Sequence, residues 1–476
     1  MPLPQSCLLW FRQDLRLTDN PALVAAAAKG SILPIYIYDT AHPKQWQMGA
    51  ASRWWLHHSL TALDQSIEGH LRIFMGDPLK IIPELLNQTG IRSIVWNRCY
   101  EPWQIQRDTQ LKKQLLEDEI EVESFNGTLL WEPWKIHKED GSPYKVFTPY
   151  YRRGCLNAPE PRRPSKAPQK MKWMHPRLND TCLSDLALMP TINWYEQIAA
   201  QWQPGEAGAQ EHLSRFIDDN IQNYKQGRDY PNLKSTSRLS PHLHFGEISP
   251  NTVWHRARQA FNSNIRNANL DCFLSELGWR EFSYYQLFHF PDLPEKNFQE
   301  KFDRFPWGKD TAALKAWQKG QTGVPIVDAG MRELWQTGYM HNRVRMIVGS
   351  FLVKNLLQHW SQGEQWFWDC LVDADLASNS ASWQWVAGSG ADAAPYFRIF
   401  NPVTQGQKFD ANGAYVRQYC PELSEVPDKF IHCPWEASPN VLQQAGLELG
   451  VDYPKPIVDL KASRQRALIA FSQIKS

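Results

Sequence analysis

The sequence predicts an α/β domain built on a parallel sheet, followed by an all-α domain. Three observations carry this prediction. Short apolar runs alternate with amphipathic segments over residues 6–130, strand signals fade after Trp194, and a proline-rich basic stretch separates the two regions. Because a chain of 476 residues is too long for one typical core, two or three domains are expected. The predicted boundaries are 1–130 for the α/β domain, 131–195 for a linker and 196–476 for the helical domain.

The first region has the periodicity of a Rossmann-like domain. Its buried strands are predicted at Cys7–Phe11, Ile32–Tyr38, Leu71–Met75 and Ile94–Trp96. Its helices are predicted between them, at Ala22–Lys29, Ala51–His70, Pro78–Thr89 and Gln104–Glu119. This alternation indicates a parallel sheet with helices on both faces. No G-x-G-x-x-G follows the first strand, so the dinucleotide fingerprint is absent.

The linker and the C-terminal region differ in texture. Prolines are frequent between Pro133 and Pro168, where arginines and lysines accumulate with few acids, as expected of an interdomain connector. Such a basic segment either contacts phosphates or is merely solvated. After Trp194 helical patterns dominate, and a last amphipathic helix is predicted around Leu460–Gln473.

Charge and composition restrict the function classes. Lys+Arg 51 against Asp+Glu 50 give a net charge of +1, so any contact with nucleic acid must come from a local patch. Twenty-two tryptophans exceed what packing usually recruits, and stacking on bases or on a cofactor is one use for the excess.

The eight cysteines are scattered without a C-x-x-C pair, which favours free thiols in a reducing compartment and argues against a metal site. The first residues lack a basic segment followed by a long apolar core, and nowhere do 18 apolar residues run together. We therefore expect a cytoplasmic protein that does not enter a membrane.

The run Leu371–Asn401 places polar side chains among apolar and aromatic neighbours. Two carboxylates, Asp373 and Asp375, would enter the interior and need donors there. An N–H-rich ring system such as a flavin would supply donors, and a nearby arginine would neutralise one charge. If the next segment is helical, Asn379 and Trp383 share one face, whereas Trp385 points roughly opposite.

The motifs DADLASNSASWQW and GADAAPYFRIFNP in this run resemble the flavin-domain signature of DNA photolyases and cryptochromes, most closely that of class I cyclobutane pyrimidine dimer photolyases. Further motifs agree along almost the whole chain: WFRQDLRLTDN, YKVFTPY, TSRLSPHLHFGEISP, ELGWREF, GYMHNRVRM and KFDANGAYVRQYCPEL. The resemblance implies an antenna-binding α/β domain and an all-helical domain that binds FAD and DNA.

The resemblance assigns the FAD contacts residue by residue. It gives this role to Tyr224, Thr236, Ser237, Arg238, Leu239, Ser240, Phe273, Arg345, Asp373, Ala374, Asp375 and Asn379. The hydroxyls of 236–240 lie ahead of a helix-like segment and suit a diphosphate, although such a sequence alone is more often a helix cap. Arg345 is placed to pair with Asp373. Asn379 matches the residue beside flavin N5, where a neutral amide tolerates the reduced anionic flavin that repair needs.

A second set matches the family's substrate contacts. DNA or dimer binding is implied for Arg228, Glu276, Trp279, Arg280, Asn342, Arg343, Met346 and Trp385. An acid beside an indole on one helix face suits an extruded base pair, and photolyases are among the enzymes known to extrude bases. Relatives that act on (6-4) photoproducts carry a catalytic histidine in this helix, near the position of Met346. The methionine here favours the cyclobutane dimer as the substrate. Catalytic roles are implied for Glu276 and Asn379, and for the electron-passing tryptophans Trp307, Trp360 and Trp383.

In the family the first domain holds an antenna chromophore, either methenyltetrahydrofolate or 8-hydroxy-deazaflavin. Where the folate-binding members carry an Asn-Glu pair, this chain has Trp103 and Gln104, so both chromophores stay open. The turn Arg12–Arg16 is either a solvated loop with internal ion pairs or part of the antenna site.

The resulting hypothesis is a monomeric lyase that repairs UV-damaged DNA with light, through reduced FAD and a flipped-out pyrimidine dimer. The alternative from another class is a cryptochrome, a photoreceptor that signals through a partner. Asn379 and the complete set of dimer contacts argue against it. A redox flavoprotein that does not use DNA is the third possibility.

Overall fold

The computed structural model describes residues 6–264, 266–392 and 398–474. The chain divides into two compact units, Met1–Gln222 with Ser237–Pro291, and Asn223–Thr236 with Asp292–Ser476. The predicted boundary near residue 195 does not coincide with this division. The helices Glu206–Asp219, Ser240–His244, Pro250–Ala260 and Ala268–His289 were expected in the all-α domain but belong to the first unit.

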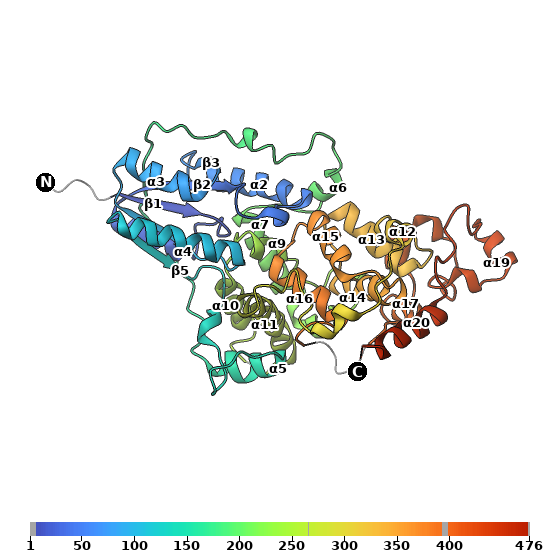
Figure 1. The fold of residues 1–476 in the computed structure, drawn as a ribbon. Helices are drawn as coiled ribbons and strands as arrows, with labels where there is room; N and C mark the ends of the chain where they lie inside the picture. The colour runs from blue at the N-terminus through green and yellow to red at the C-terminus, as the bar shows by residue number, and fades with distance from the viewer. Residues whose placement is uncertain (1–5, 265, 393–397, 475–476) are drawn as a thin grey trace. The chain divides into compact units, whose positions relative to one another are not determined.

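The first unit is built on a parallel sheet whose strands follow the order β3-β2-β1-β4-β5 (Figure 1). The strands are β1 (Ser6–Phe11), β2 (Ser31–Asp39), β3 (Arg72–Gly76), β4 (Ser93–Asn97) and β5 (Glu121–Phe125). The helices that alternate with them are α1 (Pro21–Lys29), α2 (Ala50–Ser66), α3 (Pro78–Thr89) and α4 (Pro102–Glu117). All four predicted strands and all four predicted helices are confirmed.

Two strands of this sheet were missed by the sequence analysis. β5 carries the polar sequence EVESF and pairs only with β4, so its alternation is weak. β6 (Lys172–Trp173) is two residues long and pairs with β2. The sheet therefore has a short sixth strand that comes from the predicted linker.

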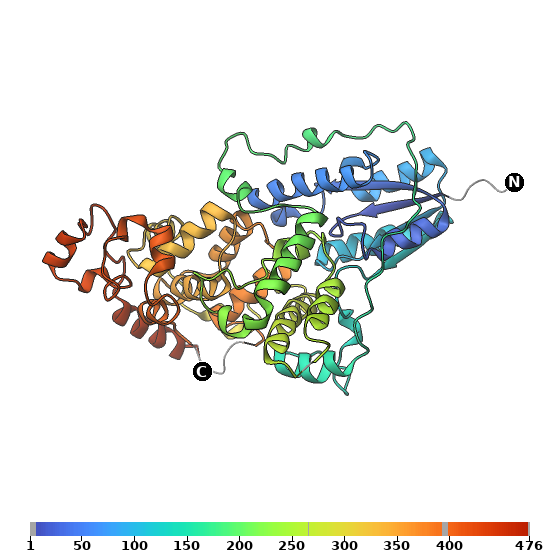
Figure 2. The ribbon, with the colours of Figure 1, turned by 180° about the vertical axis from the view of Figure 1, so that it is seen from behind.

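The predicted linker forms short helical turns up to Asn157, and residues 158–181 then run extended and are bonded to the sheet (Figure 2). The amide of Met174 donates to Ile32 at 2.7 Å, and that of Thr181 donates to Ile73 at 2.7 Å. Two arginines of the linker form ion pairs within the unit, Arg152 with Asp271 and Arg162 with Asp19. At these two positions, a phosphate could bind the arginine only if the ion pair were broken first.

The turn Arg12–Arg16 is buried, so the expectation of a solvated loop is wrong, whereas the expectation of internal ion pairs is confirmed. Arg12 pairs with Asp108 at 2.5 Å. Arg16 is 1% exposed and donates to the carbonyls of Gly127 and Gly246, both at 2.7 Å. Because Gly246 lies in the segment 237–291, this buried guanidinium ties that helical segment to the sheet.

The first unit has six further α-helices in its described residues, of which α9 and α11 carry predicted site residues. They are α5 (Phe147–Pro149), α6 (Glu196–Ala199), α7 (Glu206–Asp219), α9 (Ser240–His244), α10 (Pro250–Ala260) and α11 (Ala268–His289). In α11, the Asn267 side chain caps the helix by accepting from the amides of Asn269 and Leu270. The buried carboxylate of Glu281 accepts from the amides of Leu130 and Trp131, at 2.8 and 3.2 Å.

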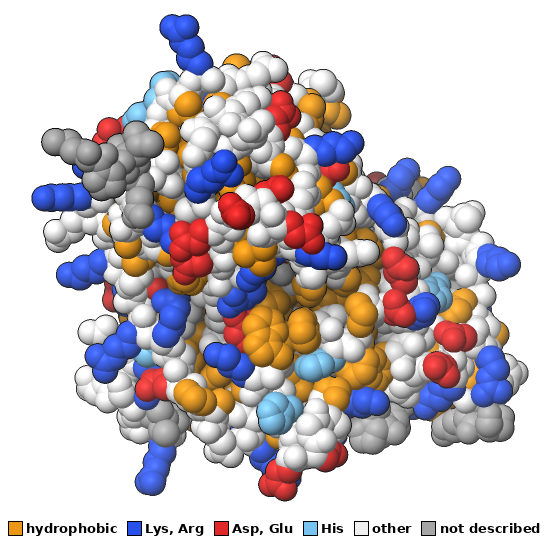
Figure 3. All heavy atoms as spheres, turned by 60° about the vertical axis from the view of Figure 1, so that its left-hand side comes forward, with side chains coloured by type: hydrophobic (Ala, Val, Ile, Leu, Met, Phe, Trp, Pro, Cys, Tyr) orange, Lys and Arg blue, Asp and Glu red, His pale blue; other side chains and the backbone are white. Residues whose placement is uncertain are grey.

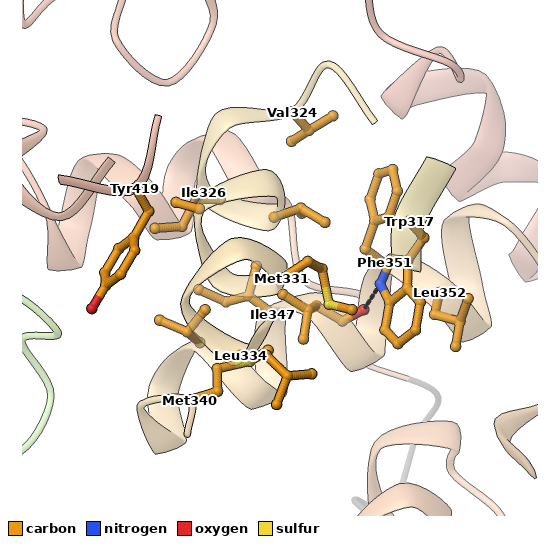
Figure 4. Close-up of a cluster of buried hydrophobic side chains, with 14 of the residues drawn as sticks. Trp317, Val324, Ile326, Met331, Leu334, Met340, Ile347, Phe351, Leu352 and Tyr419 are labelled. Atoms are coloured by element: carbon orange, nitrogen blue, oxygen red, sulfur yellow. Dashed lines mark hydrogen bonds between the residues drawn. The ribbon is translucent and has the colours of Figure 1, made fainter. Parts of the chain in front are cut away.

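The second unit is helical throughout its described residues, apart from a bridge between Leu449 and Tyr453. Its α-helices are α8 (Tyr224–Gly227), α12 (Thr311–Gln318), α13 (Pro325–Thr337), α14 (Asn342–Ser350), α15 (Trp360–Cys370), α16 (Leu376–Ala387), α17 (Pro402–Phe409), α18 (Ala414–Tyr419), α19 (Pro439–Gln444) and α20 (Leu460–Ser472). The last of these confirms the predicted C-terminal helix. At the core, the Trp317 indole donates to the Val348 carbonyl at 3.1 Å (Figure 4).

Charged side chains of both signs are interspersed on the face drawn in Figure 3, as a net charge of +1 suggests. Within the described ranges, no helix has the length and apolar character needed to span a bilayer.

Replacement of Gly246 by alanine tests the tie between the sheet and the helical segment. Its φ is +67°, and an added methyl group would lie 2.0 Å from the Gln13 carbonyl oxygen. Gly446 is the matched control, since its φ is +66° and nothing lies within 4 Å of an added methyl. We expect Gly446→Ala to cost about 1 kcal/mol from backbone strain alone, and Gly246→Ala roughly 3 kcal/mol or more. Equal melting temperatures for the two variants would contradict the tie.

Candidate functional site

An ion pair between the half-buried Arg345 and the buried Asp373 forms the core of the site in the second unit. The Nη2 atom of Arg345 lies 2.9 and 3.1 Å from the two carboxylate oxygens, and its Nε donates to the Met340 carbonyl at 2.7 Å. Asp373 is 8% exposed. Burial alone would lower the pKa of Arg345, but the Asp373 carboxylate raises it above its usual value. The predicted pairing is confirmed, and Arg345 stays charged.

The second carboxylate, Asp375, begins α16. Its Oδ1 accepts from the Ser378 amide at 2.8 Å, so it caps the helix as an N-cap residue. Asp375 is 8% exposed and Ala374 is 2% exposed, as expected for a segment that enters the interior. The cap fixes where the helix starts, and thereby where Asn379 and Trp383 project from it.

Asn379 is buried and oriented by the neighbouring helix α15. Its Nδ2 donates to the carbonyl oxygen of Glu364 at 3.0 Å. The next residue, Ser380, donates through its hydroxyl to Glu364 Oε1 at 2.5 Å. The amide of Asn379 is therefore held in one orientation by a residue that sequence analysis missed.

Glu364 is a neutral acid at ordinary pH. It is 1% exposed, and burial raises its pKa to about 8, against the opposing hydrogen bond from Ser380. Its position was readable from the pattern, because Trp360, Glu364 and Phe367 share one buried face of α15. An acid on such a face is either paired or protonated.

The three predicted electron-passing tryptophans all lie in the second unit. Trp360 is fully buried and donates to Asn297 Oδ1 at 2.8 Å. The ring of His359 lies 4.9 Å from Trp307 and 5.2 Å from Trp360, centroid to centroid, and so joins them. Trp383 packs against α15 so closely that a methyl group on Gly363 would lie 2.1 Å from its ring.

α14 carries three of the predicted DNA contacts of this unit, Asn342, Arg343 and Met346. Asn342 is exposed and Met346 is half-buried, one turn later on the same helix. Arg343 is half-buried and forms an ion pair with Asp229 at 2.6 Å. Of the remaining second-unit residues, Tyr224 in α8 is buried, and the half-buried Arg228 lies 5.5 Å from its ring centroid.

Trp385 is half-buried in α16 and packs against the core of the second unit. Trp279, its proposed counterpart in an aromatic clamp, belongs to the first unit. The clamp therefore stays a prediction.

In the first unit, α11 brings Glu276 and Trp279 onto one half-buried face. The Trp279 ring stacks on Phe147 with centroids 3.8 Å apart and planes 12° apart, which holds the indole rigidly. Arg280 donates to the Thr128 carbonyl at 2.9 Å and pairs with Glu281 at 3.1 Å, so its guanidinium is engaged within the unit. Phe273 is buried, with its ring 4.8 Å from that of Phe216.

The predicted phosphate-binding segment lies at a unit boundary. Thr236 ends a stretch of the second unit, and Ser237 begins a stretch of the first. Leu239 is buried, Ser240 opens α9, and Arg238 has a φ of 52° with its guanidinium 4.1 Å from the Trp202 ring. Part of the GADAAPYFRIFNP motif, residues 393–397, lies outside the described residues.

A pocket of about 150 Å³ opens near the carboxyl end of β4 in the first unit. Its aromatic lining is Trp96, Tyr100, Trp134 and Phe288, and its charged lining is Arg98, Asp108 and Lys112. The strand order reverses between β1 and β4, and ligands of open parallel sheets bind at such a point.

The side chain of Gln104 is held by hydrogen bonds to Glu101 at 2.9 Å and to Arg107 at 3.1 Å. Among the described side chains, no three His, Cys, Asp or Glu residues gather to hold a metal ion.

Known proteins agree with this arrangement over almost the whole chain. The family model described as the FAD binding domain of DNA photolyase matches residues 273–473, and that described as DNA photolyase matches residues 7–169. The chain belongs to the DNA photolyase family. The deoxyribodipyrimidine photo-lyase of Agrobacterium fabrum is 49% identical over 474 residues, 98% of each chain. Cryptochrome-2 of Arabidopsis thaliana is 39% identical over 499 residues, 100% of this chain and 80% of that protein.

Among solved structures, the chain is similar to a bacterial class III photolyase from Agrobacterium tumefaciens. The TM-score is 0.95 at 48% identity, and the match covers 100% of this chain and 98% of the other. The resemblance in the sequence pointed instead to class I. The family assignment from the motifs is confirmed. The structural neighbour is titled a class III photolyase, whereas the motifs most resemble those of class I.

The pH dependence of stability tests the neutral state of Glu364. Its pKa is raised from 4.5 to about 8 by burial, so between these values the folded protein keeps a proton that the unfolded chain has lost. The wild type should therefore lose stability as pH rises from 5 to 8, by at most about 1.4 kcal/mol per pH unit. Glu364→Gln removes this dependence. The melting temperature of the variant minus that of the wild type should therefore increase as pH rises from 5 to 8. A difference that stays constant from pH 5 to 8 would show that Glu364 is ionised in the folded state.

Proposed function

We propose that this protein repairs cyclobutane pyrimidine dimers in UV-damaged DNA with light, as a class III photolyase. The observation that carries the proposal is Asn379, a buried neutral amide that donates to the backbone carbonyl of Glu364, in the same unit as the Arg345–Asp373 pair. The photolyase relatives and the similarity to a class III photolyase structure support the same reaction.

The residues present fit a flavin. In the second unit they offer a charged guanidinium, two buried carboxylates and an oriented amide, which match the mixed donors and acceptors of an isoalloxazine and its ribityl chain. We propose that Arg345, Asp373, Asp375 and Asn379 hold that part of FAD. The hydroxyls of Thr236, Ser237 and Ser240 suit its phosphates. Bound, reduced FAD would supply the light-driven electron.

The chain's own residues then act by charge and position. Glu364 brings no negative charge to the site at neutral pH, because its pKa is about 8. The Asp373 charge is compensated by Arg345, so an anionic ring meets little net repulsion. Trp307, Trp360 and Trp383 are proposed to pass electrons inward when the cofactor must be reduced.

On the substrate side, we propose that Asn342 and Met346 of α14 contact the dimer, with Glu276 and Trp279 of α11. Trp279 is suited to stack on an extruded base because Phe147 fixes its plane. Arg228 and Arg343 are assigned to phosphates. Arg280 is left out of this set, since Thr128 and Glu281 already hold its guanidinium.

We also propose that the aromatic pocket of the first unit binds the antenna chromophore. Trp134 is 45% exposed, so a flat ring can stack on it, and Lys112 suits an acidic group. Methenyltetrahydrofolate combines a planar ring with a carboxylate tail, and 8-hydroxy-deazaflavin combines a planar ring with an acidic ring hydroxyl.

A repair assay tests the main proposal. Purified protein, chemically reduced so that the tryptophans are not needed, is illuminated with an oligonucleotide carrying one thymine dimer. We expect restored thymine from the wild type, and at least about a tenfold lower yield from Trp279→Ala because stacking on an extruded base is lost. A wild type that binds flavin yet restores no thymine would support the cryptochrome alternative. Unchanged repair by Trp279→Ala would contradict its role at the lesion.

Reconstitution tests the antenna pocket. Holoprotein is incubated with each chromophore, and the absorption band retained after gel filtration is measured. We expect the wild type to retain one of them, and Trp134→Ala to lose at least about 90% of that band while its flavin content is unchanged. Trp335→Ala, which removes another exposed tryptophan, is the control. Equal retention by both variants would place the antenna elsewhere.

A further inference from the structure

The ring of His359 contacts two of the tryptophans that are proposed to pass electrons. Its centroid lies 4.9 Å from that of Trp307, with planes 74° apart, and 5.2 Å from that of Trp360, with planes 33° apart. All three residues belong to the second unit. Because Coulomb energy is largest at short range, a charge on this imidazole would act strongly on both indoles.

The geometry holds the imidazole in its neutral form. His359 is the N-cap residue of α15, where its Nδ1 accepts from the Ser361 amide at 3.2 Å. An amide N–H can only donate, so Nδ1 carries no proton here, and protonating it would break the cap. The N-terminus of a helix also disfavours a cation. Burial lowers the pKa of His359, and the charge of the exposed Asp303 opposes this effect only in part.

The two indoles keep their protons, because neither N–H faces a base. The indole nitrogen of Trp307 is buried and has no hydrogen-bond partner among the described residues. That of Trp360 donates to the side-chain oxygen of Asn297 at 2.8 Å, and a neutral amide does not take up a proton at ordinary pH. A tryptophan that loses an electron here therefore becomes a radical cation, and its positive charge stays beside His359.

We propose that His359, by staying uncharged, lets Trp307 and Trp360 give up an electron, and that an imidazolium in its place blocks photoreduction of the cofactor. This inference rests on the proposed function. One electron leaves the tryptophans for the oxidised flavin, and a thiol in solution replaces it. Two thiols, each losing one electron and one proton, end as a disulfide. A cationic His359 would raise the energy of the tryptophan radical cation, because like charges repel at this distance.

The experiment measures the initial rate of photoreduction of oxidised FAD in the holoprotein, with excess thiol, from pH 8 to pH 5. His359→Asn keeps an uncharged N-cap and removes the titration. The rate of the wild type divided by that of this variant should be near one at pH 8. It should fall at least about threefold by pH 5, as the imidazole takes up a proton. His359→Arg carries a cation throughout and should be at least about tenfold slower than His359→Asn at pH 8.

Thermal unfolding checks the same protonation without light. Because the pKa of His359 is lowered in the folded state, the unfolded chain binds a proton first as pH falls below 6.5. The melting temperature of the wild type minus that of His359→Asn should therefore decrease as pH falls from 7 to 5. His341→Asn is the matched control, since His341 caps α14 and accepts from the Arg343 amide at 3.2 Å. Its photoreduction rate should keep the pH dependence of the wild type.

A ratio of wild type to His359→Asn that stays constant from pH 8 to pH 5 would overturn the proposal. Equal rates at pH 8 for His359→Arg and His359→Asn, both loaded with flavin, would overturn it too, as would a wild type that is not photoreduced at all. Repair by chemically reduced wild type is measured in parallel, because it needs no electron from the tryptophans. Failure to restore thymine there would refute the proposed function, whereas normal repair beside a constant ratio would refute only the role of His359.

Discussion

The site in the second unit depends on the ion pair between Arg345 and Asp373, whose side chains are 26% and 4% exposed. Withdrawing charged groups from water is costly, and the cost is recovered only if their geometry is good and further hydrogen bonds satisfy them. Both conditions hold, because Arg345 contacts both oxygens of Asp373 and donates also to the Met340 carbonyl. The pair joins α14 to the segment before α16. Since Asp375 caps α16 two residues later, the same pair sets the position of Asn379.

The second buried acid, Glu364, differs from Asp373 in its partners, and this difference determines the charge of the site. Glu364 has no cation among its hydrogen-bonding partners in the described part of the chain, only the Ser380 hydroxyl, and its pKa rises to about 8. One carboxylate is therefore paired with a cation, and the other is kept neutral by protonation. Both solutions prevent an uncompensated negative charge near Asn379. This is the condition that an electron-rich ring requires of its surroundings.

Local patterns predicted the fold far better than they predicted the division into units. Cys7–Phe11 and Ile32–Tyr38 were readable as strands because each is a continuous apolar run. β5 was not, since EVESF pairs on one side only and carries two acids. The unit boundary depends on contacts between distant residues, such as Arg16 with Gly246, which no window of sequence reveals. In the site, motif resemblance supplied Arg345 with Asp373. It did not supply Glu364 or His359, whose roles arise from the partners that folding brings to them.

Sequence identity alone does not separate a repair enzyme from a photoreceptor, because a photolyase and a cryptochrome match this chain at 49% and 39% over nearly its full length. In the proposed flavin site, the neutral amide of Asn379 argues for repair, because it tolerates a reduced anionic flavin. Features that a DNA substrate would use argue the same way. They are the Trp279 indole stacked on Phe147 and an exposed Asn342 one turn from Met346. Their joint presence favours repair.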